Sequence, residues 1–200
     1  IMSSMGIENN DEIVIYDNSD VISSCRCWYN LIYFGHDPKL VHVLDGGFKK
    51  WKKENKITNN EMASTKASNY KANENKKLVK NKQEIDKNIS ENQFYVIDAR
   101  SRERFEGKVA EPRKGLRSGS IKNSLCLPFV ELINKDDHTF IAKDKIVEKF
   151  SSIGLDYNKN VIFSCGSGIT ASVLALAYSL INAKYIPTIY DGSWSEYGKN

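Results

Sequence analysis

Residues 160–171 read NVIFSCGSGITA, and the order of residue types in this stretch decides the fold. The apolar, β-branched residues predict a buried strand over 160–164. Cys165 follows directly and opens a short loop rich in glycine and serine. A helix is predicted from about Gly168 to Ile181. A strand, a short loop and a helix in this order are typical of an α/β domain, in which ligands bind at the carboxyl ends of strands.

The chain contains two copies of this pattern. Each copy has a strand, a helix, a second strand and a D-G-x-[FW] turn, at 13–17, 21–34, 40–44 and 45–48 in the first copy and at 160–164, 168–181, 185–190 and 191–194 in the second. A strand–helix–strand unit implies a parallel sheet with a right-handed crossover. We therefore expect two tandem α/β domains, each with a parallel sheet flanked by helices.

The two copies differ in what precedes them. The second copy follows further predicted elements, a strand at 94–98, a short strand near 124–127 and a helix at about 143–150. In the first copy only sixteen residues precede Asp17. We predict three parts, namely the C-terminal half of a first domain at 1–52, a Lys/Asn/Ser-rich linker at 53–76 and a complete domain at 77–200. On this interpretation the chain is an N-terminally incomplete version of a longer two-domain protein.

Cys165 stands where a strand end, a flexible loop and a helix start meet. Gly166 and Gly168 allow the backbone to bend, so that successive amide N–H groups can point at the sulfur. The positive end of the following helix faces the same point. Both effects favour a thiolate and would stabilise a terminal persulfide anion. The alternative is a buried structural cysteine in front of a turn, and the loop sequence makes this the weaker interpretation.

The composition is that of an ordinary globular protein. The chain has 200 residues, of which 40% are hydrophobic, and a formal net charge of +4. It has no apolar run of the roughly 20 residues that a membrane span needs and no signal-peptide pattern, so we expect a cytoplasmic protein. The lysine-rich run at 49–53 is interpreted as solvated surface that could attract small anions. No nucleic-acid or membrane partner is expected.

The cysteine and histidine positions favour neither a metal site nor a disulfide framework. The four cysteines form no C-x-x-C pair, and the three histidines show no ligand spacing. We therefore expect no metal and no cofactor. Cys25 and Cys27 lie in a helix-like apolar stretch and are predicted to be two buried structural thiols.

Several short motifs are spaced over essentially the whole chain. They are C-G-S-G-I-T-A at 165–171, D-A-R at 98–100, R-F at 104–105, E-P-R at 111–113, G-L-R at 115–117, D-G-S-W-S-E at 191–196, F-G-H at 34–36 and D-G-G-F at 45–48. Together they resemble the 3-mercaptopyruvate sulfurtransferases of the rhodanese superfamily. The resemblance implies tandem rhodanese-like domains, the first inactive because Asp17 takes the place of the nucleophile. Residues 119–123 depart from the G-H-I-P-G of the family, at a position that is usually structural. Asp98 and Arg100 are interpreted as an ion pair that braces a strand end.

By this resemblance Cys165 is the nucleophile and Ser167 supplies a catalytic hydroxyl. Arg104 and Arg113 would bind the carboxylate and keto groups of the substrate, which a planar guanidinium can grip with two hydrogen bonds. The remaining loop positions are also expected to contact the substrate, namely Gly166, Gly168, Ile169 and Thr170.

The resemblance implies a sulfurtransferase that uses a Cys165 persulfide. Sulfur would move from 3-mercaptopyruvate to cyanide or to a thiol acceptor such as a thioredoxin-like protein, with release of pyruvate. Thiosulfate-specific relatives resemble C-R-K-G-V-T, whereas Gly166 and Ser167 are neutral, which favours mercaptopyruvate as the donor. A thiosulfate sulfurtransferase and a non-enzymatic domain for sulfur relay or protein binding remain alternatives. A cysteine phosphatase is nearly excluded, because its C-x5-R motif would need arginine where Ala171 stands.

Overall fold

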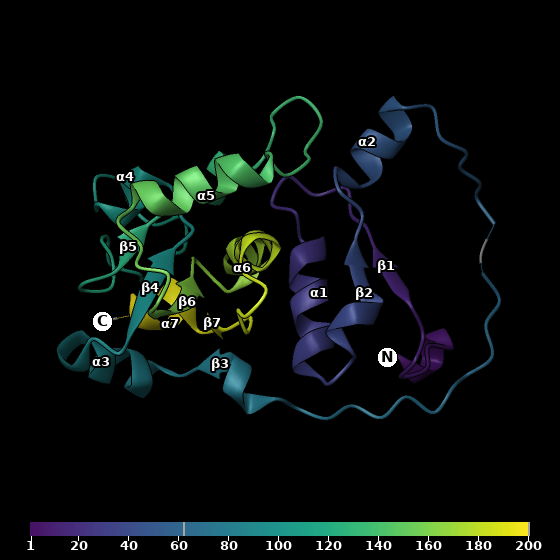
Figure 1. The fold of residues 1–200 in the computed structure, drawn as a ribbon, viewed down its shortest axis with the longest axis horizontal. Helices are drawn as coiled ribbons and strands as arrows, with labels where there is room; N and C mark the ends of the chain where they lie inside the picture. The colour runs from purple at the N-terminus through teal and green to yellow at the C-terminus, as the bar shows by residue number, and fades with distance from the viewer. Residues whose placement is uncertain (62, 200) are drawn as a thin grey trace.

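The computed structural model describes residues 1–61 and 63–199 (Figure 1). The strands are β1 (Ile13–Ile15), β2 (Val41–Val43), β3 (Val79–Lys80), β4 (Phe94–Asp98), β5 (Leu125–Cys126), β6 (Asn160–Ser164) and β7 (Ile189–Tyr190). The α-helices are α1 (Ser24–Tyr33), α2 (Gly47–Lys53), α3 (Lys82–Glu91), α4 (Arg102–Phe105), α5 (Lys143–Ser152), α6 (Ile169–Ile181) and α7 (Ser193–Tyr197). The short 3-10 helices are η1 (Ser3–Met5), η2 (Pro38–Leu40), η3 (Lys76–Leu78) and η4 (Phe129–Leu132). Within the described residues, no helix is long and apolar enough to cross a membrane.

The strands form two separate parallel sheets. β1 pairs with β2, and the larger sheet has the order β3-β7-β6-β4-β5. In Figure 1 α6 lies beside the larger sheet and α1 lies between α6 and the smaller sheet. The predicted fold class, parallel sheets flanked by helices, is confirmed.

β6 lies at the centre of the larger sheet, which explains its continuous apolar sequence. It pairs with β4 along its whole length. Phe150 of α5, Phe163 of β6 and Tyr178 of α6 pack edge to face, with ring centroids 5.0 to 6.0 Å apart. Because all strands of this sheet run in the same direction, the loops that follow β4, β5, β6 and β7 meet at one edge. Cys165 lies at that edge.

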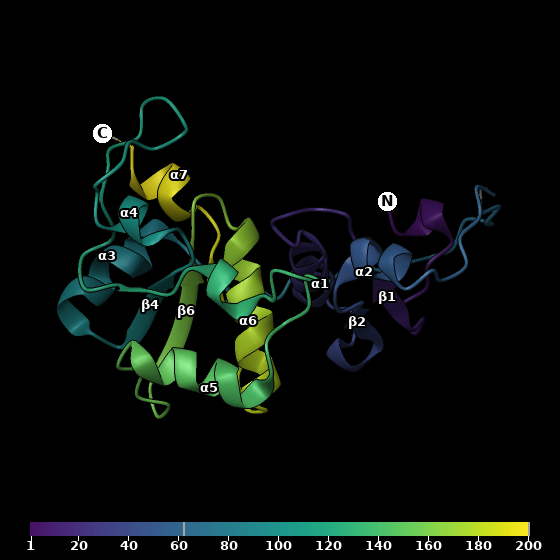
Figure 2. The same ribbon diagram turned by 90° about the horizontal axis from the view of Figure 1, so that it is seen from above.

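The two copies predicted from the sequence share the same backbone hydrogen bond at their strand ends. The Trp194 N–H donates to the Cys165 carbonyl at 2.9 Å, and the Phe48 N–H donates to the Asp17 carbonyl at 2.8 Å. The loops after β6 and β1 are therefore equivalent, and Asp17 stands where the second copy has Cys165. Figures 1 and 2 both show the two copies side by side, with α1 packed against α6.

Three local predictions are wrong in detail. The strand predicted at 185–190 shrinks to β7, because Pro187 has no N–H to donate to a neighbouring strand. The first helix begins at Ser24 rather than near residue 21, because Ile22 has a φ of 49°, outside the helical region. Cys27 is exposed and not buried, because it lies about 200° around the helix axis from the fully buried Cys25. Burial raises the pKa of the Cys25 thiol well above its ordinary value.

The segment predicted as a linker forms neither helix nor strand in its described residues between α2 and η3. Its second half nevertheless runs along the first copy. The buried ring of His36 contacts the Tyr70 hydroxyl at 3.1 Å through Nδ1 and the Asp11 carbonyl at 2.9 Å through Nε2. The Asn73 N–H donates to the Phe34 carbonyl at 2.9 Å. This part of the segment is attached to the first copy, and the domain boundaries themselves stay a prediction.

Candidate active site

Cys165 lies between β6 and α6, with 2% of its surface exposed. The Ser167 N–H donates to Cys165 Sγ at 3.4 Å, so the loop folds back over the sulfur. Gly168 makes this turn at a φ of 79°, in the left-handed region that favours glycine. The loop therefore directs at least one backbone dipole at the sulfur atom.

A hydroxyl from another part of the chain accepts hydrogen bonds from two of the loop N–H groups. Ser193, the first residue of α7, accepts hydrogen bonds from the Cys165 N–H and the Gly168 N–H, both at 3.1 Å. We expected successive loop amides to converge on the sulfur. The Gly168 N–H instead donates to Ser193, so this amide is already used and does not face a substrate.

Both arginines predicted to bind substrate lie beside the loop. The Arg104 guanidinium holds Glu111 through Nε at 3.1 Å and Nη2 at 2.6 Å. Its Nη2 would stand 3.3 Å from a Cβ built on Gly166. Arg113 is exposed, and its Nη1 donates to the Gly166 carbonyl at 3.3 Å. A guanidinium has five N–H donors, so Arg104 keeps its Nη1 edge available after it has bound Glu111.

Glu111 joins Arg104 to a buried ion pair behind the loop. Its side chain is 1% exposed and also accepts from Arg100 Nη1 at 2.7 Å. Arg100 binds Asp98 through both Nε and Nη2, as predicted for a pair at the strand end. Burial opposes ionisation of Glu111, but Arg104 and Arg100 outweigh it and hold the pKa of this carboxyl below its ordinary value of 4.5.

The charges around the loop are therefore not all balanced. Arg100 and Arg104 face Asp98 and Glu111, so these two cations are neutralised. In the described part of the chain, Arg113 makes no ion pair. The positive charge of Arg113 is thus available to attract an anion to Gly166 and the neighbouring sulfur.

The first copy also contributes to the loop, through a residue that sequence reasoning missed. Arg26 of α1 binds Asp191 Oδ1 at 2.5 Å and donates to the Gly168 carbonyl at 3.3 Å. Arg26 belongs to none of the motifs, so only the packing of α1 against α6 reveals this contact. Glu111 and Ser193 were also missed as site residues, although both stand inside quoted motifs, E-P-R and D-G-S-W.

The remaining predicted site residues lie on the loop with differing exposure. Ser167, Gly166 and Thr170 are half-buried, and Ile169 is 37% exposed. The Ser167 hydroxyl makes no hydrogen bond with the described residues, so it is free to face a ligand. The roles of these residues stay predictions.

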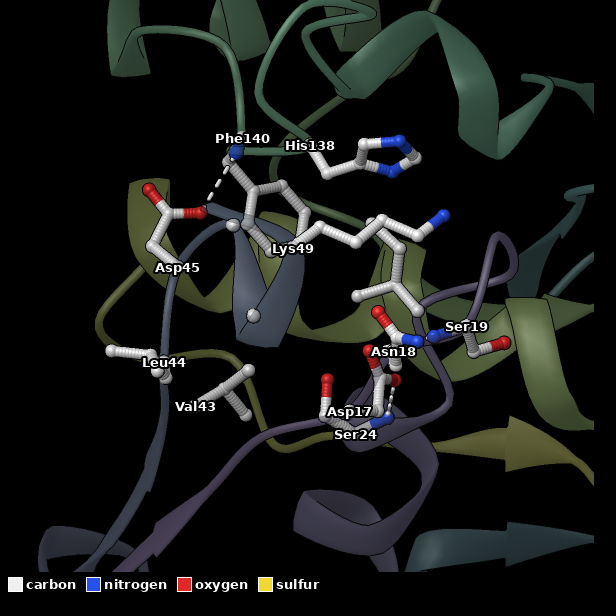
Figure 3. Close-up of a pocket in the computed structure, with 13 residues that line it drawn as sticks. Asp17, Asn18, Ser19, Ser24, Val43, Leu44, Asp45, Lys49, His138 and Phe140 are labelled. Atoms are coloured by element: carbon white, nitrogen blue, oxygen red, sulfur yellow. Dashed lines mark hydrogen bonds between the residues drawn. The ribbon is translucent and has the colours of Figure 1, made fainter. Parts of the chain in front are cut away.

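The equivalent pocket of the first copy contains a carboxylate in place of the thiol (Figure 3). The polar residues of its lining are Asp17, Asn18, Ser19, Ser24, Asp45, Lys49 and His138. Asp17 accepts a hydrogen bond from the Ser24 N–H at 2.5 Å, so its carboxylate occupies the start of α1. Asp45 accepts from the Phe140 N–H at 2.9 Å, and burial raises the pKa of this carboxyl. A carboxylate cannot carry sulfane sulfur, which agrees with the predicted inactivity of this copy.

Comparisons with known proteins place this geometry in a family. The model of the rhodanese-like domain matches residues 2–54 and 81–200. Thiosulfate/3-mercaptopyruvate sulfurtransferase 1 of Arabidopsis thaliana is 31% identical over 98% of this chain and 56% of its own length. Thiosulfate sulfurtransferase of Bos taurus is 33% identical over 98% of this chain and 66% of its own length. The chain thus spans between about half and two thirds of the length of these relatives.

The fold agrees with these matches. The crystal structure of SseA from Escherichia coli, a 3-mercaptopyruvate sulfotransferase, superimposes with a TM-score of 0.83 at 30% identity, over 98% of this chain and 71% of that chain. The Cys165 loop, the two arginines beside it and the duplicated α/β architecture are explained together by one ancestry. The chain belongs to the rhodanese family.

Proposed function

We propose that this chain is a sulfurtransferase that moves sulfane sulfur from 3-mercaptopyruvate to a thiol or cyanide acceptor through a Cys165 persulfide. The observation that carries the proposal is the position of Cys165. Its sulfur accepts a hydrogen bond from the Ser167 N–H. Arg113 donates to the carbonyl of Gly166, the next residue, and the Arg104 guanidinium lies beside the same residue. A nucleophilic sulfur beside the charge of Arg113, unpaired within the described residues, and the open edge of Arg104 suits a small anionic sulfur donor.

In the first half-reaction the Cys165 thiolate attacks the sulfur of 3-mercaptopyruvate. An S–S bond forms, the C3–S bond of the substrate breaks, and the substrate's thiol proton ends on C3, so the products are the Cys165 persulfide and pyruvate. Arg113 and the open edge of Arg104 would hold the carboxylate and keto oxygens. We assign the proton transfer to the Ser167 hydroxyl, which is half-buried in the same loop. In the second half-reaction a thiol, such as that of a thioredoxin-like protein, or cyanide removes the outer sulfur.

The neutral loop favours the keto acid over thiosulfate as the donor. Gly166 and Ser167 add no charge beside the sulfur. The dianion thiosulfate therefore gains less Coulombic stabilisation there than it would from a loop that contained cations. Thiosulfate remains the second candidate, because the charge of Arg113 would also attract it and because a similar bovine protein is a thiosulfate sulfurtransferase.

Steady-state rates with each donor and cyanide, together with the mass of the Cys165 peptide, test the proposal. We expect the peptide to gain one sulfur atom when 3-mercaptopyruvate is mixed with the protein alone, and we expect faster turnover than with thiosulfate. Cys165→Ser should remove both signals. A persulfide without repeated pyruvate release would indicate sulfur relay rather than an enzyme. No sulfur on Cys165 from either donor would refute the proposal.

A further inference from the structure

Ser193 has a backbone conformation that serine rarely adopts. Its φ is 49°, in the left-handed region, and the residue is fully buried. Glycine would take this conformation without a steric penalty. A serine at such a position therefore needs a reason that the backbone does not supply.

The duplicated architecture offers an internal comparison. Gly47 stands at the equivalent position of the D-G-G-F turn in the first copy, and its φ is 56°. Both copies thus have a left-handed φ at this position, although the preceding residues differ, with φ 82° at Gly46 and φ −56° at Gly192. Only the copy that contains the reactive cysteine has a side chain there. In the first copy a Cβ on Gly47 would stand 2.8 Å from the Asp17 carbonyl oxygen, so that copy has no room for one.

The Ser193 hydroxyl uses its full hydrogen-bonding capacity on three backbone groups. It accepts from the Cys165 N–H and the Gly168 N–H, both at 3.1 Å, and donates to the Tyr190 carbonyl at 2.8 Å. One O–H donor and two lone pairs are all that a hydroxyl offers. The three partners lie after β6, before α6 and at the end of β7. A single oxygen atom therefore closes the Cys165 loop at both of its ends and attaches it to the neighbouring strand.

This closure determines which amide remains for the sulfur. Because the first and last N–H groups of the loop are held by Ser193, the loop bends at Gly166 and Ser167. The Ser167 N–H then points back to Cys165 Sγ, at 3.4 Å. Without the oxygen, two buried N–H groups would lose their acceptor, and the loop would have to rearrange to satisfy them, which would turn the Ser167 N–H away from the sulfur.

We propose that Ser193 is a positioning residue for the nucleophile. Its hydroxyl sets the shape of the Cys165 loop, and the strained backbone is kept in the catalytic copy for the sake of this oxygen atom. The importance of this role for turnover rests on the proposed sulfurtransferase activity, whereas the role in shaping the loop does not.

Ser193→Gly tests the proposal without a folding penalty from the backbone, because Gly47 shows that glycine suits this turn. Ser193→Ala removes the oxygen but keeps the unfavourable φ. Ser179→Ala is the matched control, since its hydroxyl donates to the Leu176 carbonyl within α6 and has no contact with the loop. Alkylation of Cys165 by iodoacetamide is followed by peptide mass spectrometry across a range of pH. The exposed Cys27 in the same sample serves as the internal reference.

We expect Ser193→Gly to slow alkylation of Cys165 about tenfold or more and to move its pH profile upward, with Cys27 unchanged. Ser193→Ala should show the same loss and a lower melting temperature than Ser193→Gly. Sulfur loading from 3-mercaptopyruvate should fall in parallel, and Ser179→Ala should match the unmodified chain. Alkylation of Cys165 in Ser193→Gly within about twofold of the unmodified chain would overturn the proposal. If the unmodified chain takes up no sulfur but Ser193→Gly still slows alkylation, the proposed function fails and the positioning role stands.

Discussion

Replacement of Arg113 by alanine should weaken binding of the donor without weakening the fold. Arg113 is exposed, makes no ion pair in the described part of the chain and contacts the loop only at the Gly166 carbonyl, at 3.3 Å. A hydrogen bond to a charged group contributes about 1.5–3 kcal/mol. Because Arg113 faces solvent, we expect the lower end of this range. At about 1.4 kcal/mol for each factor of ten, KM for 3-mercaptopyruvate should rise about tenfold.

Arg104→Ala provides the contrast, because Arg104 also forms an ion pair with a buried carboxylate. Its removal deprives the buried Glu111 of one of its two cations. We therefore expect Arg104→Ala to raise KM and also to lower the free energy of unfolding, by about 1–3 kcal/mol. For Arg113→Ala the free energy of unfolding should change by no more than about 0.5 kcal/mol.

Initial rates of pyruvate release against donor concentration, with excess cyanide, separate the two effects, and urea titrations supply the unfolding free energies. Arg113→Lys keeps the charge but cannot donate the two parallel hydrogen bonds of a guanidinium. Its KM should therefore lie between those of Arg113→Ala and the unmodified chain. An unchanged KM in Arg113→Ala, or an equal loss of stability in Arg113→Ala and Arg104→Ala, would refute this account of the charges around the loop.

Three further predictions concern stability. Glu111 has a pKa below its ordinary 4.5, so its ionised form stabilises the fold at neutral pH, and this stability is lost as pH falls from 4.5 through the lowered value. When the free energy of unfolding is measured against pH, Glu111→Gln should reduce the fall in this acid range, and an identical fall would contradict the ion-pair assignment. Gly168→Ala should lower the melting temperature and cost about 1–2 kcal/mol or more, because φ is 79° and the new Cβ would stand 2.7 Å from both Arg26 Nη1 and Asp191 Oδ1; an unchanged melting temperature would show that the loop can relax. Asp17→Ala should cost about 0.5–2 kcal/mol through loss of the hydrogen bond at the start of α1, while sulfur transfer by the folded chain stays the same; a loss of turnover at full folding would show that the first pocket takes part in the reaction.

Much of the fold could be predicted because it depends on residues close together in the chain. The bounds predicted for the strands at 94–98 and 160–164 match β4 and β6, since a run of β-branched and aromatic residues is itself the signal of a buried strand. The helix after Cys165 was predicted within one residue of its true start. The duplication followed from repeated order, and the hydrogen bonds at Asp17 and Cys165 confirm that the two loops are equivalent.

Predictions failed where a local pattern met a constraint of another kind. Cys27 lies in an apolar stretch, yet the direction in which α1 packs leaves it exposed while Cys25 is buried. The buried residues Cys25, Trp28 and Ile32 follow a helical period that leaves Cys27 out, so the prediction failed because the segment was treated as uniformly apolar.

The sequence by itself determined the α/β class and the duplication, and it predicted Cys165 as the nucleophile, because each of these rests on residue types at short spacing. Only the tertiary structure decided how the Cys165 loop is held. Ser193 reaches Cys165 across 28 residues, and Arg26 reaches Asp191 across 165 residues. Such hydrogen bonds exist only after sheets and helices have packed and brought distant backbone and side-chain atoms within about 3 Å. Their partners are set by three-dimensional proximity, which no spacing along the chain records.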